Sequence, residues 1–89
     1  MSVTHIVTYD LMNRKDYREL FDALKAFSSC HFLGSVWLIK SHLTPGQIGQ
    51  ELAQYIDKDD KLFVARLAGD AAWTTSYPPD VLAWFYAGL

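Results

Sequence analysis

The carboxylate of Asp10 stands where a strand-like run ends and a helix is about to begin. It closes the segment "VTHIVTYD" and precedes a small basic cluster of Arg14, Lys15 and Arg18. An aspartate at such a junction can accept hydrogen bonds from the N–H groups of the following loop. It can also supply one oxygen ligand to a hard divalent cation, which needs several such ligands. Both interpretations of Asp10 remain open from the residues alone.

The metal interpretation requires a second carboxylate. Two copies of Asp10 related by a twofold axis would hold one Mg²⁺ together with water molecules, and the metal would activate water for phosphodiester cleavage. A second acidic segment, "IDKDDKLF", is typical of a solvated turn before a strand, and we assign it no catalytic role.

Other catalytic patterns are absent from the sequence. The chain has no Gly-rich phosphate loop, no HExxH motif and no Cys/His zinc pattern. His5, His31 and His42 lie far apart along the chain, and His5 is expected to pack inside a strand. Cys30 is the single cysteine, so no intrachain disulfide can form, and its apolar neighbours predict a buried, unreactive thiol.

The composition predicts a single domain spanning residues 1–89. The 89 residues are 51% hydrophobic and carry a formal net charge of −2. No general basic field draws the chain to RNA or DNA, so nucleic-acid binding would depend on the local basic cluster. The first residues do not resemble a signal peptide, and no segment approaches the roughly 18 apolar residues of a membrane helix. We therefore expect a cytoplasmic protein without membrane contact.

Hydrophobic periodicity predicts six elements in the order β-α-β-β-α-β. They are a strand at 3–11, a helix at 16–27, a hairpin at 30–41 that turns at Gly34 and Ser35, a helix at 44–56 and a strand at 61–69. The first helix is predicted to begin with a capping box of Asp16 and Glu19, and the second with one of Thr44 and Gln47.

This order predicts the α+β class and, within it, a ferredoxin-like sandwich with core 3–69: a four-stranded antiparallel sheet with both helices on one face. The other face would expose residues such as Val36 or Trp37, and a homodimer would cover it. In the extension 70–89, Pro78 and Pro79 break the chain and Asp80 is expected to cap a short apolar helix. This helix would cover the open face of its own subunit, reach across to the partner, or recruit another protein.

Three pieces of the chain together resemble a known family. "IVTYDL" with its basic loop, "SVW" and "YIDKDDKLFVARL" are similar to the small CRISPR-associated protein of the spacer-integration pair, an endoribonuclease-like family, over residues 3–67. "YDL", "DDKLFV" and "AGDAAW" resemble more closely the SinR-like family of bacterial proteins related to it. VapD-type toxin ribonucleases share the expected fold.

The resemblance implies a ferredoxin-like homodimer in which Asp10 is the catalytic, Mg²⁺-coordinating residue, paired with Asp10 of the other subunit. Tyr9 and Ser35 match motif positions that line the same cleft, and Arg14 and Arg18 match basic residues that approach phosphate. The expected function is a Mg²⁺-dependent ribonuclease or nuclease of the CRISPR-associated or toxin/defence type. The alternative is a non-catalytic dimeric module, which the net charge of −2 and the aromatic tail favour. A nucleotide sensor is a third interpretation, based on fold analogy alone.

Overall fold

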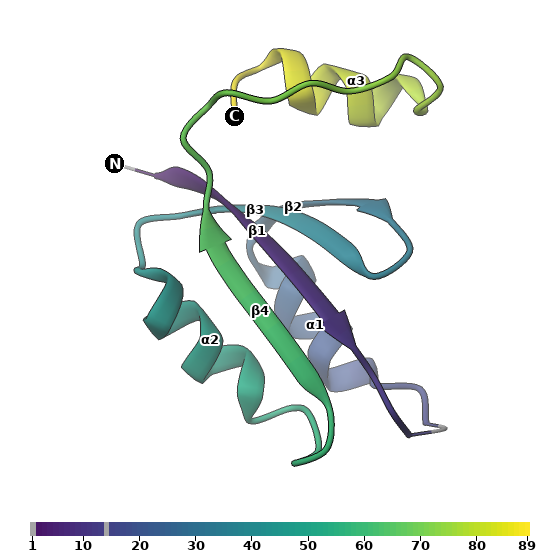
Figure 1. Cartoon of the computed structure of the whole chain (residues 1–89), viewed down its shortest axis with the longest axis vertical. Coiled ribbons are helices and arrows are strands. Elements are labelled where there is room, and N and C mark those ends of the chain that lie inside the picture. The colour runs from purple at the N-terminus through teal and green to yellow at the C-terminus, as the bar shows by residue number, and fades with distance from the viewer. Residues whose placement is uncertain (1, 14) are drawn as a thin grey trace.

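The computed structural model describes residues 2–13 and 15–89, and these form one sheet with three helices (Figure 1). The elements in chain order are β1 (Val3–Asp10), α1 (Arg18–Ala26), β2 (Ser28–Leu33), β3 (Val36–Ser41), α2 (Pro45–Ala53), β4 (Lys61–Arg66) and α3 (Pro79–Tyr86). All six predicted elements are present, and the hairpin turns at Gly34 and Ser35 as expected.

The sheet has the strand order β2-β3-β1-β4, and every neighbouring pair is antiparallel. Helices α1 and α2 lie on one side of the β2–β3 hairpin and α3 lies on the other (Figure 1). The prediction of an α+β protein with a four-stranded antiparallel sheet is therefore confirmed. No described helix is long and apolar enough to cross a membrane.

The main core lies between the sheet and the helices α1 and α2. Alternate residues of β1 and β3 point into it, because successive strand side chains point to opposite faces. Its buried members include Val7, Tyr9, Leu20, Leu24, Trp37, Ile39, Ile48 and Leu52. Of the two residues predicted for the open face, Val36 or Trp37, the structure places Val36 there. Trp37 is instead 3% exposed in the core beneath α1 and α2.

The two core helices begin in different ways. The predicted capping box at α2 is confirmed, because the Thr44 hydroxyl accepts from the Gln47 N–H and the Gln47 side chain accepts from the Thr44 N–H. The predicted box at α1 is wrong. The N-cap there is Tyr17, in a left-handed conformation with φ of 48°, while the Asp16 carboxylate accepts from the Arg18 N–H at 3.2 Å.

The C-terminal extension folds back over its own chain. Val81 and Phe85 of α3 join Cys30 and Leu38 in a second buried cluster, so the helix covers part of the sheet face opposite to α1 and α2. The expectation that Asp80 caps α3 is wrong, because the N-cap is Pro78 and none of the described side chains makes a capping bond there. The prediction of a buried Cys30 is confirmed; burial raises the pKa of its thiol, and the charge of Asp80 adds to the shift.

Candidate functional site

The side chain of Asp10 belongs to the sheet face that α3 covers only in part. Thr4, Ile6, Thr8 and Asp10 alternate along this face of β1, and Ile6 packs against the α3 cluster. Beyond Ile6, an area remains that neither α3 nor the tail covers. We call this area the uncovered patch; it consists of Thr8, Asp10, Val36, Lys61 and Phe63.

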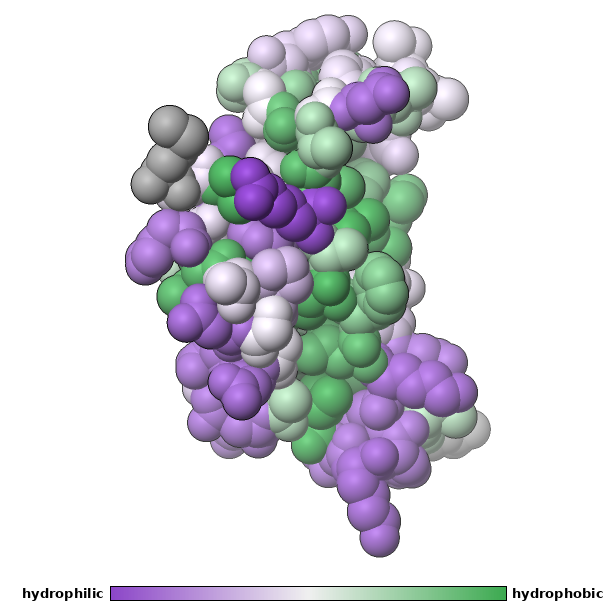
Figure 2. All heavy atoms as spheres, turned by 60° about the vertical axis from the view of Figure 1, so that its left-hand side comes forward, coloured by the Kyte–Doolittle hydropathy of each residue, from purple (hydrophilic) through white to green (hydrophobic). Residues whose placement is uncertain are grey.

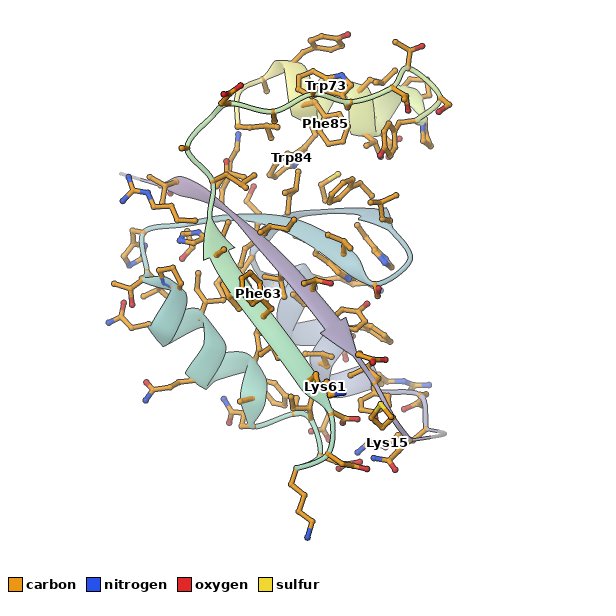
Figure 3. The ribbon with its side chains drawn as sticks, viewed as in Figure 1. Lys15, Lys61, Phe63, Trp73, Trp84 and Phe85 are labelled. Atoms are coloured by element: carbon orange, nitrogen blue, oxygen red, sulfur yellow. The ribbon has the colours of Figure 1, made fainter. Side chains whose placement is uncertain are left out.

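Phe63 makes the uncovered patch apolar at its centre. Phe63 is 62% exposed, whereas large aromatic side chains are usually buried in protein cores or interfaces. Lys61 lies at the start of β4 and Phe63 further along the same strand (Figure 3). The space-filling view shows hydrophobic surface continuing from the α3 end of the molecule down between hydrophilic residues (Figure 2). An exposed apolar patch with a charged rim is typical of an interaction site.

Asp10 lies directly opposite Lys61 in the ladder between β1 and β4. The two side chains share a face, and they line a shallow hollow of about 200 Å³ together with Thr8 and Phe63. Within residues 2–13 and 15–89, no group of three or more His, Cys, Asp or Glu side chains is arranged to hold a metal ion. Asp10 therefore offers a single carboxylate, with the cation of Lys61 as its partner in the ladder.

Tyr9 and Ser35 lie near Asp10 in different ways. The Tyr9 side chain is on the opposite face of β1, where its hydroxyl accepts a hydrogen bond from Trp37 Nε1 at 3.1 Å in the buried core. The carbonyl oxygen of Ser35 accepts from the Tyr9 N–H at 3.2 Å, so the β2–β3 turn lies beside the end of β1. The structure thus brings Ser35 close to the Asp10 end of the sheet and separates the Tyr9 phenol from the Asp10 carboxylate.

The basic residues expected to approach phosphate are not part of the uncovered patch. Arg18 is the first residue of α1, and its guanidinium lies 3.8 Å from Asp16 on an exposed surface. It lines a separate hollow with Lys15 and Tyr55. Arg14 lies outside the described residues.

The acidic turn at 57–60 has a role that the sequence did not reveal. Asp60 Oδ1 accepts hydrogen bonds from the Met12 N–H at 2.7 Å and from the Tyr17 hydroxyl at 2.8 Å, and its Oδ2 accepts from the Asp57 N–H at 2.7 Å. Lys15 Nζ lies 2.8 Å from Asp57 Oδ1. The turn therefore holds the loop between β1 and α1, directly after Asp10, instead of being simply solvated.

These contacts set the charge state of Asp60. Burial alone raises the pKa of its carboxyl, but the N–H groups of Met12 and Asp57, the Tyr17 hydroxyl and the nearby Lys15 cation together hold that pKa below its ordinary value of 3.8. The sequence carries no local signal for this role, because Met12 and Tyr17 lie 48 and 43 residues from Asp60.

His5 is packed inside β1 as predicted. It is fully buried, and neither ring nitrogen has a hydrogen-bond partner among the described residues. Burial lowers its pKa below 6.5; the polar backbone of Val3 partly offsets this shift, and the Arg66 cation adds to it. Burial therefore favours the neutral form of the imidazole. The ring faces the side of the sheet opposite to the uncovered patch.

No model of a known protein family matches the chain. The uncovered patch combines an exposed phenyl ring, an exposed carboxylate and a cross-strand lysine on one sheet face.

Proposed function

We propose that the protein is a ferredoxin-like homodimeric module that associates through the uncovered patch. The β-α-β-β-α-β order, the strand order β2-β3-β1-β4 and the placement of α1 and α2 on one side support the ferredoxin-like assignment. The observation that carries the proposal is Phe63, which lies 62% exposed beside a charged pair. A second copy packed face to face would remove this ring from water.

The position of α3 favours one arrangement of the two sheets. Because α3 packs on β2 and on Leu38 of β3, a partner sheet has most room over β1 and β4. A twofold axis that runs along the strands, between β1 and β4, exchanges the two strands. Since Asp10 and Lys61 are partners in the ladder, this axis sets Asp10 opposite Lys61 of the partner subunit, and Lys61 opposite Asp10 of the partner subunit.

The axis between β1 and β4 fits a non-catalytic module best, because it uses each Asp10 carboxylate in an ion pair. Each Asp10 would pair with a cation across the interface, and two such pairs would fix the orientation of the subunits. Thr8 and Phe63 are also ladder partners, so the same axis would set each phenyl ring against Thr8 of the partner subunit. Every member of these pairs comes from the uncovered patch.

Charge exchange tests this arrangement. Asp10→Lys alone or Lys61→Asp alone would place like charges across the interface and shift the protein toward monomer in sedimentation equilibrium. The double variant Asp10→Lys with Lys61→Asp would restore the dimer. Phe63→Ser would weaken the dimer, whereas Met12→Ser, at a residue that is 54% exposed outside the patch, would not. A wild-type protein that remains monomeric at about 100 µM would overturn the proposal.

A magnesium-dependent nuclease is the second candidate, and the exposure of Asp10 beside a hollow of about 200 Å³ favours it. An axis directly over β1 would set Asp10 opposite Asp10 of the partner subunit, and the two carboxylates would share one Mg²⁺ and cleave RNA or DNA. Lys61 disfavours this arrangement, because its positive charge would lie beside Asp10 and weaken the binding of Mg²⁺.

The nuclease proposal is tested with labelled RNA and DNA. Mg²⁺-dependent cleavage that EDTA stops and Asp10→Asn abolishes would support it. Asp22→Asn, which removes an exposed carboxylate of α1, is the matched control and should retain activity. Equal cleavage by wild type and Asp10→Asn would exclude the paired-Asp10 mechanism.

A further inference from the structure

A groove lies between the two helices of the main core, on the side of the sheet away from the uncovered patch. It has a volume of about 400 Å³ and is lined by α1 on one side and by α2 with its flanking residues on the other. The helix α1 contributes Ala23 and Ala26, which are neighbours on one face because residues three apart in a helix lie side by side. Their small side chains leave room between the two helices.

One end of the groove has an apolar floor. The helices α1 and α2 run in opposite directions, because they follow β1 and β3, which are antiparallel (Figure 1). The end of α1 therefore lies beside the start of α2, where Phe27 and Leu43 line the groove. Both side chains are partly buried against the main core. An apolar group placed at this end would leave water and contact the core.

Glu51 is the one charged residue that lines the groove. Gln54 Nε2 donates to its Oε2 at 3.1 Å, and the Tyr55 hydroxyl donates to its Oε1 at 3.4 Å, so neighbours on α2 hold the carboxylate in place. Among the described residues, no basic side chain lies within the 4.0 Å of an ion pair from Glu51, because the two ion pairs present join other residues. The carboxylate therefore has no matching cation.

The electrostatic field at the Tyr55 end of the groove is negative. Burial raises the pKa of the Tyr55 hydroxyl, and the charges of Glu51 and Glu19 raise it further, so both carboxylates act on this end. Lys15 and Arg18 line the next hollow, where each is paired with an aspartate. The groove thus combines an apolar floor with a rim that favours a cation.

The groove has the size and composition of a site for a small molecule. Sites for small ligands occupy about 300–1,000 Å³ and combine mostly apolar walls with a few polar groups, and an apolar cavity of about 150 Å³ accepts benzene. Gln47 and Glu51 are one turn apart, about 6 Å along α2. A short linker therefore reaches from a ring at the apolar end to the Glu51 carboxylate.

We propose that the groove between α1 and α2 binds a small organic cation: a primary amine with an apolar, ring-sized body. The body lies over Ala23, Ala26 and Phe27, and the ammonium group donates to the carboxylate of Glu51. A carboxylate oxygen has two lone pairs, so each oxygen can accept from the ligand as well as from its neighbour on α2. The site lies on the opposite side of the sheet from the uncovered patch, so it depends neither on the dimer nor on the nuclease proposal.

A titration followed by protein NMR tests this site, with phenethylamine as the probe and phenethyl alcohol as its neutral counterpart. We expect saturable shifts at the amides of Ala23, Ala26 and Glu51, with the millimolar affinity of so small a ligand. The amine should bind about fivefold tighter than the alcohol, because its charge meets a partly solvated carboxylate. Methylamine, which lacks the apolar body, should leave these amides unshifted.

Two variants separate the contributions of the rim and the floor. Glu51→Gln should weaken binding of phenethylamine about fivefold and leave binding of the alcohol unchanged. Asp70→Asn makes the same change in net charge at an exposed position elsewhere and should have no effect. Ala26→Leu adds volume at an exposed residue that lines the groove, and it should block both probes while the remaining spectrum shows an intact fold.

Three outcomes would overturn the proposal. Absence of saturable binding of either probe to the wild-type protein up to about 20 mM would show that the groove is not a site. Equal affinity for the amine and the alcohol would show that Glu51 does not hold a cationic group. Unchanged binding of both probes to the Ala26→Leu variant would place any bound molecule outside the groove.

Discussion

The hydroxyl of Tyr17 donates a 2.8 Å hydrogen bond to Asp60 across 43 residues of sequence. This bond joins the start of α1 to the turn before β4, and Tyr17 adopts a left-handed backbone conformation at the same point. Left-handed non-glycine residues persist only where surrounding contacts hold them in place. Asp60 is therefore the residue that fixes how the chain leaves β1 and enters α1.

Asp60→Asn should lower the stability of the protein at neutral pH, because Asn keeps the shape but loses the charge and one of the two acceptor oxygens. The folded-state pKa of Asp60 lies below 3.8, so its stabilising contribution is present above pH 3.8 and is lost as the pH falls through the folded-state value. Urea denaturation from neutral pH to about pH 2.5 should show the variant and wild type converging in acid.

Asp59→Asn is the matched control, because among the described residues Asp59 accepts a single hydrogen bond, from Asn13 Nδ2 at 3.0 Å. It should cost less stability than Asp60→Asn. Equal losses from the two variants would mean that the turn acts through its overall charge and not through the bonds to Asp60.

His5→Leu should remove an acid-sensitive element of the core. The folded-state pKa of His5 lies below 6.5, so the unfolded chain binds a proton more readily, and stability falls as the pH drops from 6.5 toward the folded-state value. Leu cannot titrate and leaves no unpaired ring nitrogen, so the variant should match or exceed wild type by about 1 kcal/mol at pH 7. Its stability should also vary less between pH 7 and about pH 5. An unchanged pH profile would show that His5 does not titrate in this range.

Phe85→Ala should show how strongly the tail is attached to the sheet. Phe85 is 4% exposed and contacts Phe32, Trp73 and Tyr77, so its truncation should cost about 3–5 kcal/mol in the free energy of unfolding. Tyr86→Ala is the neighbouring control; Tyr86 is 70% exposed, and its loss should cost at most about 1 kcal/mol. Chemical denaturation followed by tryptophan fluorescence measures both. A small loss for Phe85→Ala would mean that α3 is attached only weakly.

Thr44→Ala should cost about 1 kcal/mol, because it removes the side-chain oxygen that accepts from the Gln47 N–H at 3.1 Å. Thr44→Ser keeps that oxygen and should recover most of the loss. Thermal unfolding followed by circular dichroism compares the two variants with wild type. If both variants lose the same stability, the effect comes from the Thr44 methyl group and not from the cap.

The beginnings of the two core helices show what the sequence could and could not predict. The α2 cap involves Thr44 and Gln47, which are three residues apart, so local chemistry was sufficient to predict it. The start of α1 depends on Tyr17 and Asp60, and a bond over 43 residues leaves no local pattern. In the same way, the sheet was predictable from alternation, but apolar residues on both faces of β3 did not reveal that Trp37, and not Val36, faces the helices.

The candidate site shows the same division. An exposed Asp10 at the end of β1 follows from its place after a hydrophobic run. Its neighbour Lys61 depends on the ladder between β1 and β4, whose register the sequence does not specify. The sequence also did not predict that α3 packs on the sheet of its own chain, because an apolar helix can cover either its own sheet or that of a partner.

The strand order leaves β4 at an outer edge of the sheet, where one row of its backbone N–H and C=O groups faces outward. Such an edge can template the addition of strands from other chains and lead to aggregation. β4 is only six residues long and carries an exposed cation at each end, Lys61 and Arg66. Short length and terminal charge are two of the devices by which β-proteins prevent edge-to-edge polymerisation, so these two cations keep the β4 edge from growing into a continuous sheet.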